Sequence, residues 1–417
     1  MVLAEIISIG NELLNGRTIN SNASYIGQRL TDIGVHVNWI TTVGDDPKQV
    51  LNSLQLAVSR AQIVITTGGL GPTHDDITRD VVSDFFNTEL VLNQDVLDSI
   101  IRRFEKRGVK MAKINEKQAL VPKTAEVIAN TVGTAPGFIL REPTTTIFVL
   151  PGVPVESEMM IDNSVLNYIK TNYKLSFIRS QLFRTIGIPE STLFERLTDL
   201  EEIEKFVQVS FLPTKGSVDI KITAEADNEE LCLQKLHKGE SLVRPHVEDY
   251  VYATGETPLE EIIANLLIQN NFTLAVAESC TGGLIAHKLT NISGSSKYFE
   301  RGVVSYSNKA KMDILGVPAK TIEEYGAVSQ QTAIAMAEGI RKISNTHFGL
   351  STTGIAGPTG GSKDKPVGLV YIGFSAHEKS SFIKHIFVTD RITNKERFAQ
   401  AALNFFRKEI VQITSIQ

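Results

Sequence analysis

Short apolar runs alternate with longer segments of helical period at the start of the chain. The runs at residues 4–9, 35–43 and 62–67 are typical of buried strands, and 20–34 and 46–60 have the apolar spacing of amphipathic helices. Strands that alternate with helices indicate right-handed crossovers and a parallel sheet, whose ligands bind beyond the carboxyl ends of the strands. The polar residues after each strand, beginning with a Gly-bounded turn at 10–16, therefore carry the candidate chemistry.

The rest of the chain predicts two further regions. The middle has a small α+β pattern, with a strand at Phe183, a helix at 191–197, strands at 207–212 and 218–224, and a helix at 228–243. A turn-rich stretch at 252–258 then precedes a helix at 259–270, where an independent domain could begin. This last region is again α/β and ends with a helix at 394–406.

Composition narrows the class of protein. A chain of 417 residues with 42% hydrophobic content has ample core for two or three domains. A net charge of −5 argues against general nucleic-acid coating. There is no charged segment followed by an apolar signal region, and no apolar run of membrane length, so we expect a cytoplasmic protein without a membrane partner. Two cysteines are too few for a disulfide framework.

Ser279 is the first candidate for chemistry. It follows the apolar run 272–276 and precedes Gly282 and Gly283, which open a predicted helix at 284–289. Such a turn delivers a hydroxyl and several free backbone N–H groups to one point. A serine ahead of a helix is more often an N-cap, and that alternative stands on these residues alone. The adjacent Cys280 is a second candidate nucleophile, although a small buried cysteine is the commoner explanation.

A second strand end, about 25 residues later, favours Ser279 as a nucleophile over Ser279 as an N-cap. The apolar residues 302–304 lead into a polar stretch that contains Tyr306, Lys309 and Lys311. A desolvated lysine can take the proton of a serine and make it nucleophilic. Because neither 275–283 nor 302–311 contains a histidine, a Ser-His-Asp arrangement is not expected here. A serine and lysine pair, with tyrosine as a relay, is the remaining nucleophilic option.

The amino-terminal region has its own candidate site. Three glycines, Gly68, Gly69 and Gly71, are followed by the acidic pair Asp75 and Asp76, which we expect to open a helix. Glycines let a phosphate approach the backbone, and a divalent cation would bridge the two carboxylates. The alternative is an ordinary helix start whose dipole the two acids complement. Further polar side chains follow other strands, among them Asp45 and Glu156.

Taken together, these motifs resemble the CinA (competence/damage-inducible) family. Five of them resemble its amino-terminal domain, which is similar to the molybdopterin-binding fold: residues 10–16, 43–46, 68–78, 133–137 and 150–154. Six resemble its carboxy-terminal amidase domain: residues 277–283, 294–296, 306–311, 326–329, 354–358 and 366–368. The resemblance implies an α/β protein of three parts: a molybdopterin-binding-like three-layer domain (1–170), a KH-like α+β domain (171–254) and an α/β amidase domain (255–417).

The resemblance implies that the last domain is a nicotinamide-nucleotide amidase without a cofactor. It would hydrolyse nicotinamide mononucleotide to nicotinic acid mononucleotide and ammonia, within pyridine nucleotide (NAD) salvage. The family's nucleophile falls on Ser279, and Lys311 would move protons through Tyr306. Lys309 occupies a variable position of the motif and ranks below Lys311. Backbone N–H groups near Thr281, Gly282 and Gly283 would hold the oxyanion.

Two more positions match the family's substrate pocket. They are Thr353 and Arg391, and a guanidinium suits a phosphate because its fork binds two oxygens. For Arg391 the sequence alone favours the alternative of a solvated surface charge.

For the first domain the resemblance implies a metal-dependent ADP-ribose pyrophosphatase, which gives AMP and ribose 5-phosphate. The expected cofactor is a divalent cation (Mg²⁺, Mn²⁺ or Co²⁺), with K⁺ as a further candidate ion. Asp45 and Asp76 match the shared carboxylate positions, and Asp75 and Glu156 are additional candidates. Asn11 stands where the family usually has an acidic residue, which puts this activity, but not the amidase, in question.

Two alternative functions and two further expectations remain from the sequence. Both clefts could bind nucleotides without turnover in a regulatory protein linked to competence or DNA damage, or the first domain could be a molybdopterin-binding module. The middle region lacks the Gly-x-x-Gly loop with which KH domains grip nucleic acid, so we expect a spacer or oligomerisation role there. A homodimer is expected by resemblance alone.

Overall fold

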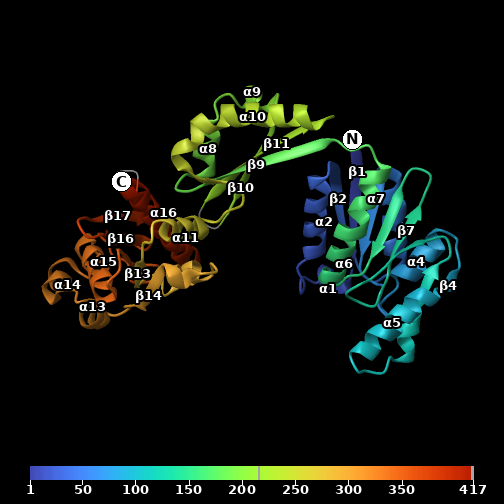
Figure 1. Ribbon diagram of the computed structural model, residues 1–417, viewed down its shortest axis with the longest axis horizontal. Coiled ribbons are helices and arrows are strands. Elements are labelled where there is room, and N and C mark those ends of the chain that lie inside the picture. The colour runs from blue at the N-terminus through green and yellow to red at the C-terminus, as the bar shows by residue number, and fades with distance from the viewer. Residues whose placement is uncertain (215–216, 415–417) are drawn as a thin grey trace. The chain divides into compact units, whose positions relative to one another are not determined.

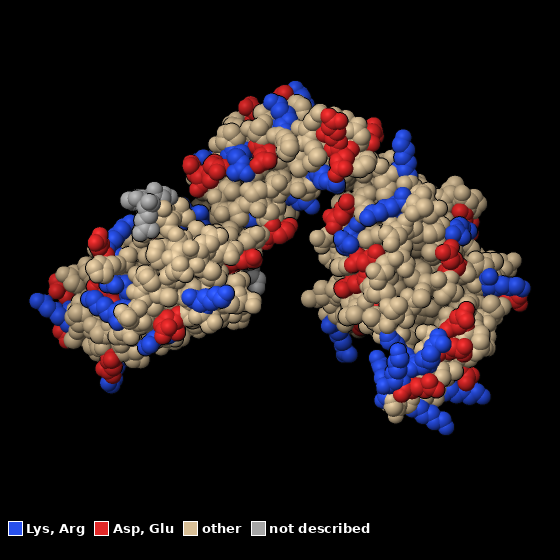
Figure 2. Space-filling model, viewed as in Figure 1, with Lys and Arg blue, Asp and Glu red and all other residues tan. Residues whose placement is uncertain are grey.

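The computed structural model describes residues 1–214 and 217–414. The chain divides into two compact units, one formed by Met1–Arg179 with Ala224–Lys235 and the other by Ser180–Thr223 with Leu236–Gln417. Within the described ranges, no helix is long and apolar enough to cross a membrane. On the face seen in Figure 2, acidic and basic side chains are interspersed, consistent with the small net charge of −5.

The first unit is built on a six-stranded sheet in the order β2-β1-β3-β8-β7-β6. The strands are β1 (Val2–Ile9), β2 (Val35–Val43), β3 (Ile63–Thr67), β6 (Glu126–Ile128), β7 (Gly137–Arg141) and β8 (Thr146–Leu150). The predicted parallel pairing is confirmed for β2, β1, β3 and β8. β7 pairs antiparallel with both of its neighbours, β8 and β6. Residues 142–145 between β7 and β8 are too few for a crossover, so these two strands cannot be parallel.

Helices cover both faces of this sheet (Figure 1). Side chains alternate between the faces along each strand, so Ile6 joins one core and Ile7 the other. On the Ile6 face lie α2 (Ser21–Asp32), α6 (Pro154–Met160), η2 (Ile161–Val165) and α7 (Leu166–Asn172). On the Ile7 face lie α3 (Pro47–Arg60) and α4 (Thr78–Phe85). The unit is thus the expected three-layer α/β domain.

Two local predictions in this unit need correction. The turn expected at 10–16 contains a one-turn helix, α1 (Asn11–Leu14). Asp75 and Asp76 do not open a helix. Helix α4 begins only at Thr78, its N-cap is Ile77, and no side chain at the N-cap accepts a hydrogen bond from the first turn. The remaining elements are β4 (Leu90–Leu92), α5 (Gln94–Lys106), η1 (Lys113–Ala119) and β5 (Leu120–Pro122), of which β4 and β5 form a two-stranded sheet.

The middle region forms a small KH-like α+β fold around a four-stranded sheet, in the order β10-β11-β9-β12. Its strands are β9 (Phe177–Thr185), β10 (Gln208–Pro213), β11 (Val218–Ala226) and β12 (Val251–Thr254). Its helices are α8 (Glu190–Arg196), α9 (Leu200–Glu204), α10 (Glu229–Val247) and η3 (Glu248–Tyr250). Two of its side chains, Ile186 and Tyr252, pack into the hydrophobic core of the carboxy-terminal domain.

The carboxy-terminal domain has a five-stranded sheet in the order β14-β13-β15-β16-β17. The strands are β13 (Leu274–Glu278), β14 (Phe299–Val304), β15 (Phe348–Gly354), β16 (Leu369–Ser375) and β17 (Ser380–Ile386). β14, β13 and β15 are parallel, and β16 and β17 are added antiparallel. The first three strands therefore end at one edge of the sheet.

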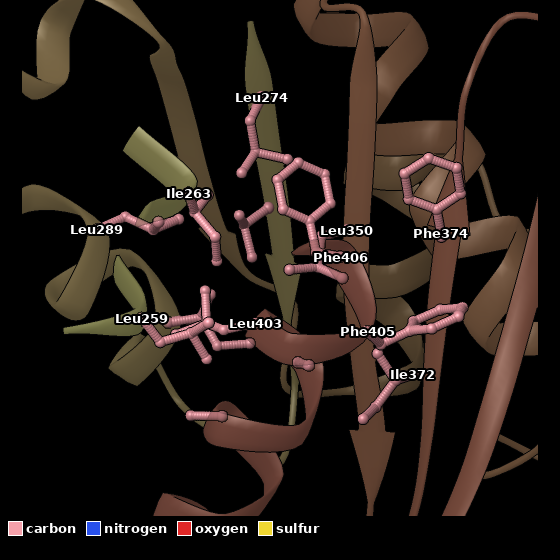
Figure 3. Close-up of a cluster of buried hydrophobic side chains, with 14 of the residues drawn as sticks. Leu259, Ile263, Leu274, Leu289, Leu350, Ile372, Phe374, Leu403, Phe405 and Phe406 are labelled. Atoms are coloured by element: carbon pink, nitrogen blue, oxygen red, sulfur yellow. The ribbon is translucent and has the colours of Figure 1, made fainter. Parts of the chain in front are cut away.

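Helices again pack on both faces. Figure 3 shows side chains of α11 (Leu259–Gln269), α12 (Leu284–Thr290) and α16 (Arg391–Thr414) meeting those of the sheet, for example Leu403 and Phe406 near Leu350. The short η4 (Ser295–Lys297) follows α12, and α13 (Asn308–Leu315) and α14 (Ala319–Tyr325) follow β14. The other face is covered by α15 (Gln330–Ser344).

The helix α15 lies directly on the backbone of the sheet. Gly349 in β15 and Gly373 in β16 face it, and a Cβ at either position would collide with the carbonyl oxygens of Ala337 and Ala333, respectively. Ser351 between them donates to the Ala333 carbonyl at 2.6 Å. This close approach fixes β15, the strand that ends beside Ser279.

Candidate active site

The strand register brings the predicted residues of the carboxy-terminal domain together. Glu278 at the end of β13 pairs with Val304 of β14 on one side and with Thr352 of β15 on the other. The residues that follow, Ser279 and Ser305, therefore leave the sheet side by side. The Ser279 N–H donates to the Thr352 carbonyl at 3.0 Å, and the Ser305 N–H donates to the Glu278 carbonyl at 2.8 Å.

Lys311 reaches Ser279 directly. Its Nζ lies 3.0 Å from the Ser279 Oγ, and it also donates to the carbonyl oxygens of Ser305 at 2.8 Å and Tyr306 at 3.2 Å. Lys311 is 1% exposed and Ser279 is 8% exposed. The helix α13, capped by the Ser307 side chain, points this lysine back toward the strand ends.

Burial lowers the pKa of Lys311, because the charged ammonium loses its hydration. A neutral amine has two N–H groups and one lone pair. The two carbonyl oxygens can hold the two N–H groups, which leaves the lone pair for the Ser279 hydroxyl proton. Lys309 is exposed and pairs with Asp313 on the surface of α13, so the geometry favours Lys311 as the base.

The structure argues against Ser279 as a helix N-cap and against Cys280 as a nucleophile. Helix α12 begins at Leu284 with Gly283 as its N-cap, so Ser279 does not cap it. Cys280 packs in the hydrophobic core, and burial raises the pKa of its thiol to about 12. A thiol that stays protonated is a poor nucleophile.

Glu278 caps α12 instead, and the sequence analysis missed this residue. Its carboxylate is 1% exposed and accepts from the backbone N–H groups of Gly283 (2.9 Å), Ile285 (3.1 Å) and Ala286 (2.9 Å). An acidic residue beside a nucleophile, close before a helix, was the available signal.

Glu278 also limits where an oxyanion can be held. The Gly283 N–H donates to it, so the expectation that Gly283 contributes is wrong for this arrangement. The N–H groups of Thr281 and Gly282 have no hydrogen-bond partner within residues 1–214 and 217–414, and they remain the candidate donors. The Thr281 side chain is buried and hydrogen-bonds to Thr352 at 2.7 Å, so it has a structural role.

Tyr306 does not stand between Lys311 and Ser279. Its side chain is 60% exposed, and its hydroxyl accepts from Arg391 Nη2 at 3.0 Å. The predicted relay is therefore wrong in this geometry, since Lys311 contacts Ser279 without it. Tyr306 contributes its carbonyl oxygen to Lys311 and its phenol to the mouth of the site.

The two predicted pocket residues lie in different settings. Arg391 is the first residue of α16 and also donates to the Gly357 carbonyl at 2.6 Å, so it is an exposed but anchored cation. Thr353 is 1% exposed and its hydroxyl donates to the Ala327 carbonyl at 2.6 Å. Thr353 thus positions the end of β15.

A second candidate site lies in the first unit. A cavity of about 630 Å³ opens where β1, β2, β3 and β8 end. All the glycines and carboxylates predicted for this region line it: Gly68, Gly69, Gly71, Asp45, Asp75, Asp76 and Glu156. Gly68 and Gly69 have φ values of 110° and 66°, which favour glycine, and any Cβ at Gly68 would meet the Ile9 carbonyl.

The carboxylates of this cavity have separate partners. Asp45 accepts from the Asn11 N–H at 3.0 Å, and Asp76 accepts from the N–H and hydroxyl of Thr73 at 2.8 and 2.6 Å. Glu156 is bound by the Asn130 amide at 2.6 Å, and burial raises its pKa. Asp75 is exposed beside His74.

These carboxylates do not form a metal centre by themselves. Among the residues that the structure describes, there is no group of three or more His, Cys, Asp or Glu side chains that could hold a metal ion. Mg²⁺ is commonly held by one or two carboxylates together with substrate phosphates and water. The expected divalent cation therefore stays a prediction.

Comparison with known proteins identifies the family of the chain. Three family models match successive parts of the chain: a probable molybdopterin binding domain at 5–171, the KH domain of damage-inducible protein CinA at 180–253, and the CinA C-terminal domain at 256–410. A "Putative competence-damage inducible protein" of Caldicellulosiruptor bescii is 42% identical over 410 residues, which is 98% of this chain and 100% of that protein. The chain belongs to the CinA family.

Other members of the CinA family are similarly related. A CinA-like protein of Dictyoglomus thermophilum is 41% identical over 409 residues, covering 98% of this chain and 99% of that protein. Among solved structures, competence/damage inducible protein CihA from Agrobacterium tumefaciens is 40% identical, with a TM-score of 0.35, over 36% of this chain and 92% of that one. The family resemblance and the three-part α/β fold expected from the sequence are confirmed.

Proposed function

We propose that the carboxy-terminal domain is a serine amidase that hydrolyses nicotinamide mononucleotide to nicotinic acid mononucleotide and ammonia. The observation that carries the proposal is the buried contact of 3.0 Å between Lys311 Nζ and Ser279 Oγ. A buried lysine with a lowered pKa, in contact with a serine at the end of a strand, is the arrangement that serine activation without histidine requires.

The first half of the reaction follows from these contacts. Neutral Lys311 takes the hydroxyl proton as Ser279 Oγ attacks the carboxamide carbon. The free N–H groups of Thr281 and Gly282 are the donors for the oxyanion that forms. The Lys311 ammonium then gives its proton to the amide nitrogen, the C–N bond breaks, and ammonia leaves an acyl ester on Ser279.

The second half reverses the roles. Water attacks the ester carbon while Lys311 accepts a proton from it. The C–O bond to Ser279 breaks, Lys311 returns the proton to the serine Oγ, and the acid product is released. The two carbonyl oxygens that hold Lys311 keep its Nζ on Ser279 through both steps. No cofactor takes part in this sequence.

The decisive experiment is ammonia release from nicotinamide mononucleotide by the full chain. We expect turnover by the parent, and a loss of at least about 1,000-fold in Ser279→Ala and in Lys311→Met, because both groups act in the same step. Lys309→Met is the matched control and should keep its activity, since Lys309 pairs with Asp313 on the surface. A folded parent without turnover would overturn the proposal in favour of a nucleotide-binding regulatory protein.

A second activity is proposed for the first unit, hydrolysis of ADP-ribose to AMP and ribose 5-phosphate. The cavity of about 630 Å³, with its glycine turn and five carboxylates, supports it. Asn11 occupies the usual acidic position and is hydrogen-bonded to Asp45 rather than free for a ligand.

Product analysis with ADP-ribose and added Mg²⁺, Mn²⁺ or Co²⁺ tests this activity. We expect AMP from the parent and none from Asp76→Ala. If ADP-ribose stays intact in the presence of each of the three cations, the cavity is better explained as a binding site for a pterin or nucleotide.

A further inference from the structure

Helices α12 and α16 both begin at the proposed amidase site, and the protein fills each of these two N-termini with one of its own carboxylates. Glu278 accepts from the first N–H groups of α12. Asp390 accepts from the N–H groups of Ile392 (2.9 Å) and Thr393 (3.1 Å) at the start of α16. The hydrogen bond from the Thr393 hydroxyl, together with these two N–H groups, lowers the pKa of Asp390. A helix N-terminus is a common place for a phosphate, but here both are occupied.

An anionic group of the substrate must therefore be held by cationic side chains. Lys311 serves Ser279, and Lys309 is paired with Asp313. Two cations of α16 remain near the site, Arg391 and Lys395, which lie one turn apart and so on one face of the helix.

Of these two cations, Lys395 is the one without a partner among residues 1–214 and 217–414. Its side chain is half-buried, yet it has no hydrogen bond or ion pair within the described part of the chain. Its Nζ lies 3.4 Å, and its Cε 3.9 Å, from the point where a Cβ on Gly282 would stand. Gly282 is three residues from Ser279, a span of at most about 11 Å. The adjacent Glu396 does not neutralise Lys395, because it pairs with Lys288.

We propose that Lys395 is a specificity-determining residue that binds the 5′-phosphate of the substrate, together with Arg391. This inference rests on the proposed amidase function and adds the group that selects a nucleotide over a nucleoside. A Cβ at position 282 would be in ordinary contact with the Lys395 ammonium, which places this cation beside the turn that follows Ser279. Arg391, anchored by Gly357 and Tyr306, supplies the second cation.

The test compares two amides that differ only in the phosphate, nicotinamide mononucleotide and nicotinamide riboside. In Lys395→Met we expect kcat/KM for the mononucleotide to fall by about tenfold or more, mainly through KM, because a charge-assisted contact is lost. For the riboside we expect a change of less than about twofold. Lys395→Arg should recover most of the loss, and Lys309→Met should leave both substrates unchanged.

Binding separates this inference from the amidase proposal. Dissociation constants for both ligands are measured in the Ser279→Ala background, with and without Lys395→Met, so that no turnover is needed. Weaker binding of the mononucleotide alone supports the phosphate contact even if the parent shows no amidase activity. If Lys395→Met weakens the binding of both ligands equally, or of neither ligand, the phosphate contact is overturned, whether or not the parent releases ammonia.

Discussion

At the scale of single residues, the proposed amidase site depends on how Lys311 is held. Lys311 is 1% exposed and has three oxygen neighbours, but no carboxylate is among its hydrogen-bond partners in the described structure. A nearby carboxylate would hold the proton on the lysine and raise its pKa, whereas burial alone favours the neutral amine. The site therefore prepares a base rather than a permanent cation.

The pH dependence of ammonia release follows from this state of Lys311. The reaction needs the neutral amine, so kcat should rise with pH through the pKa of Lys311 and then level off. Because burial lowers that pKa, the rise should lie below the ordinary lysine value of about 10.4. A pH–rate profile measures it.

Lys311→Arg is the companion variant, because a guanidinium stays protonated at every accessible pH. It should lose at least about 100-fold in kcat across the whole range. A rise in kcat centred at or above the ordinary lysine value would contradict the proposed role of the amine.

At the scale of elements, the apolar runs located the strands because a buried strand needs a continuous apolar stretch. Residues 35–43 became β2 with the predicted bounds. The reversed direction of β7 was not visible, because a strand of five residues carries no sign of its direction. Helix α16 starts at Arg391 rather than at Asn394, since Asp390 caps it through side-chain contacts that spacing does not reveal.

The same limit applies to the candidate site. Ser279, Lys311 and Arg391 stand in motifs and could be named from the sequence. Glu278 is important because its carboxylate accepts from backbone N–H groups of α12, and Lys395 because it lies beside Gly282 without a partner in the described residues. These contacts, like the bond between Tyr306 and Arg391 that replaces the predicted relay, exist only in three dimensions.

Glu278 should stabilise the turn that carries the oxyanion donors. In Glu278→Ala three backbone N–H groups lose their acceptor, and we expect the free energy of local opening to fall by about 2–4 kcal/mol. Hydrogen exchange of the segment 278–290 in the full chain measures it. Glu323→Ala, at an exposed position of α14, is the control and should change opening by less than about 0.5 kcal/mol. Unchanged exchange at Gly283, Ile285 and Ala286 would refute this role.

The contact of α15 with the sheet should tolerate no added methyl group. Gly349→Ala places a Cβ against the Ala337 carbonyl and should destabilise the domain by about 1–3 kcal/mol, seen as a lower midpoint in calorimetry. Gly27→Ala in α2 is the control, because its Cβ would lie 3.9 Å from Ile6 in ordinary contact and should be neutral or stabilising. An unchanged midpoint in Gly349→Ala would mean that α15 can shift away from the sheet.

At the scale of the whole molecule, the two candidate sites belong to different compact units. Ser279 lies in the second unit, and the cavity with Asp76 lies in the first. The KH-like region shares core residues with the carboxy-terminal domain through Ile186 and Tyr252, so a cut between them would expose apolar surface.

We expect the two activities to be lost independently. Ser279→Ala should abolish ammonia release and leave ADP-ribose cleavage within about twofold of the parent, and Asp76→Ala should do the reverse. Both activities are assayed on the same preparations, with circular dichroism as the check on folding. Loss of both in one folded variant would show that the sites are coupled.

The first turn of α16 has a consequence for how such an enzyme can change. The proposed nucleophile and base lie within residues 279–311, whereas the cations proposed to select the substrate lie within 391–395. The residues proposed for bond cleavage and those proposed for substrate recognition thus lie in separate stretches of the sequence. Substitutions confined to one helical turn could retarget the amidase to uncharged or differently charged amides, while the inherited reaction centre stays intact.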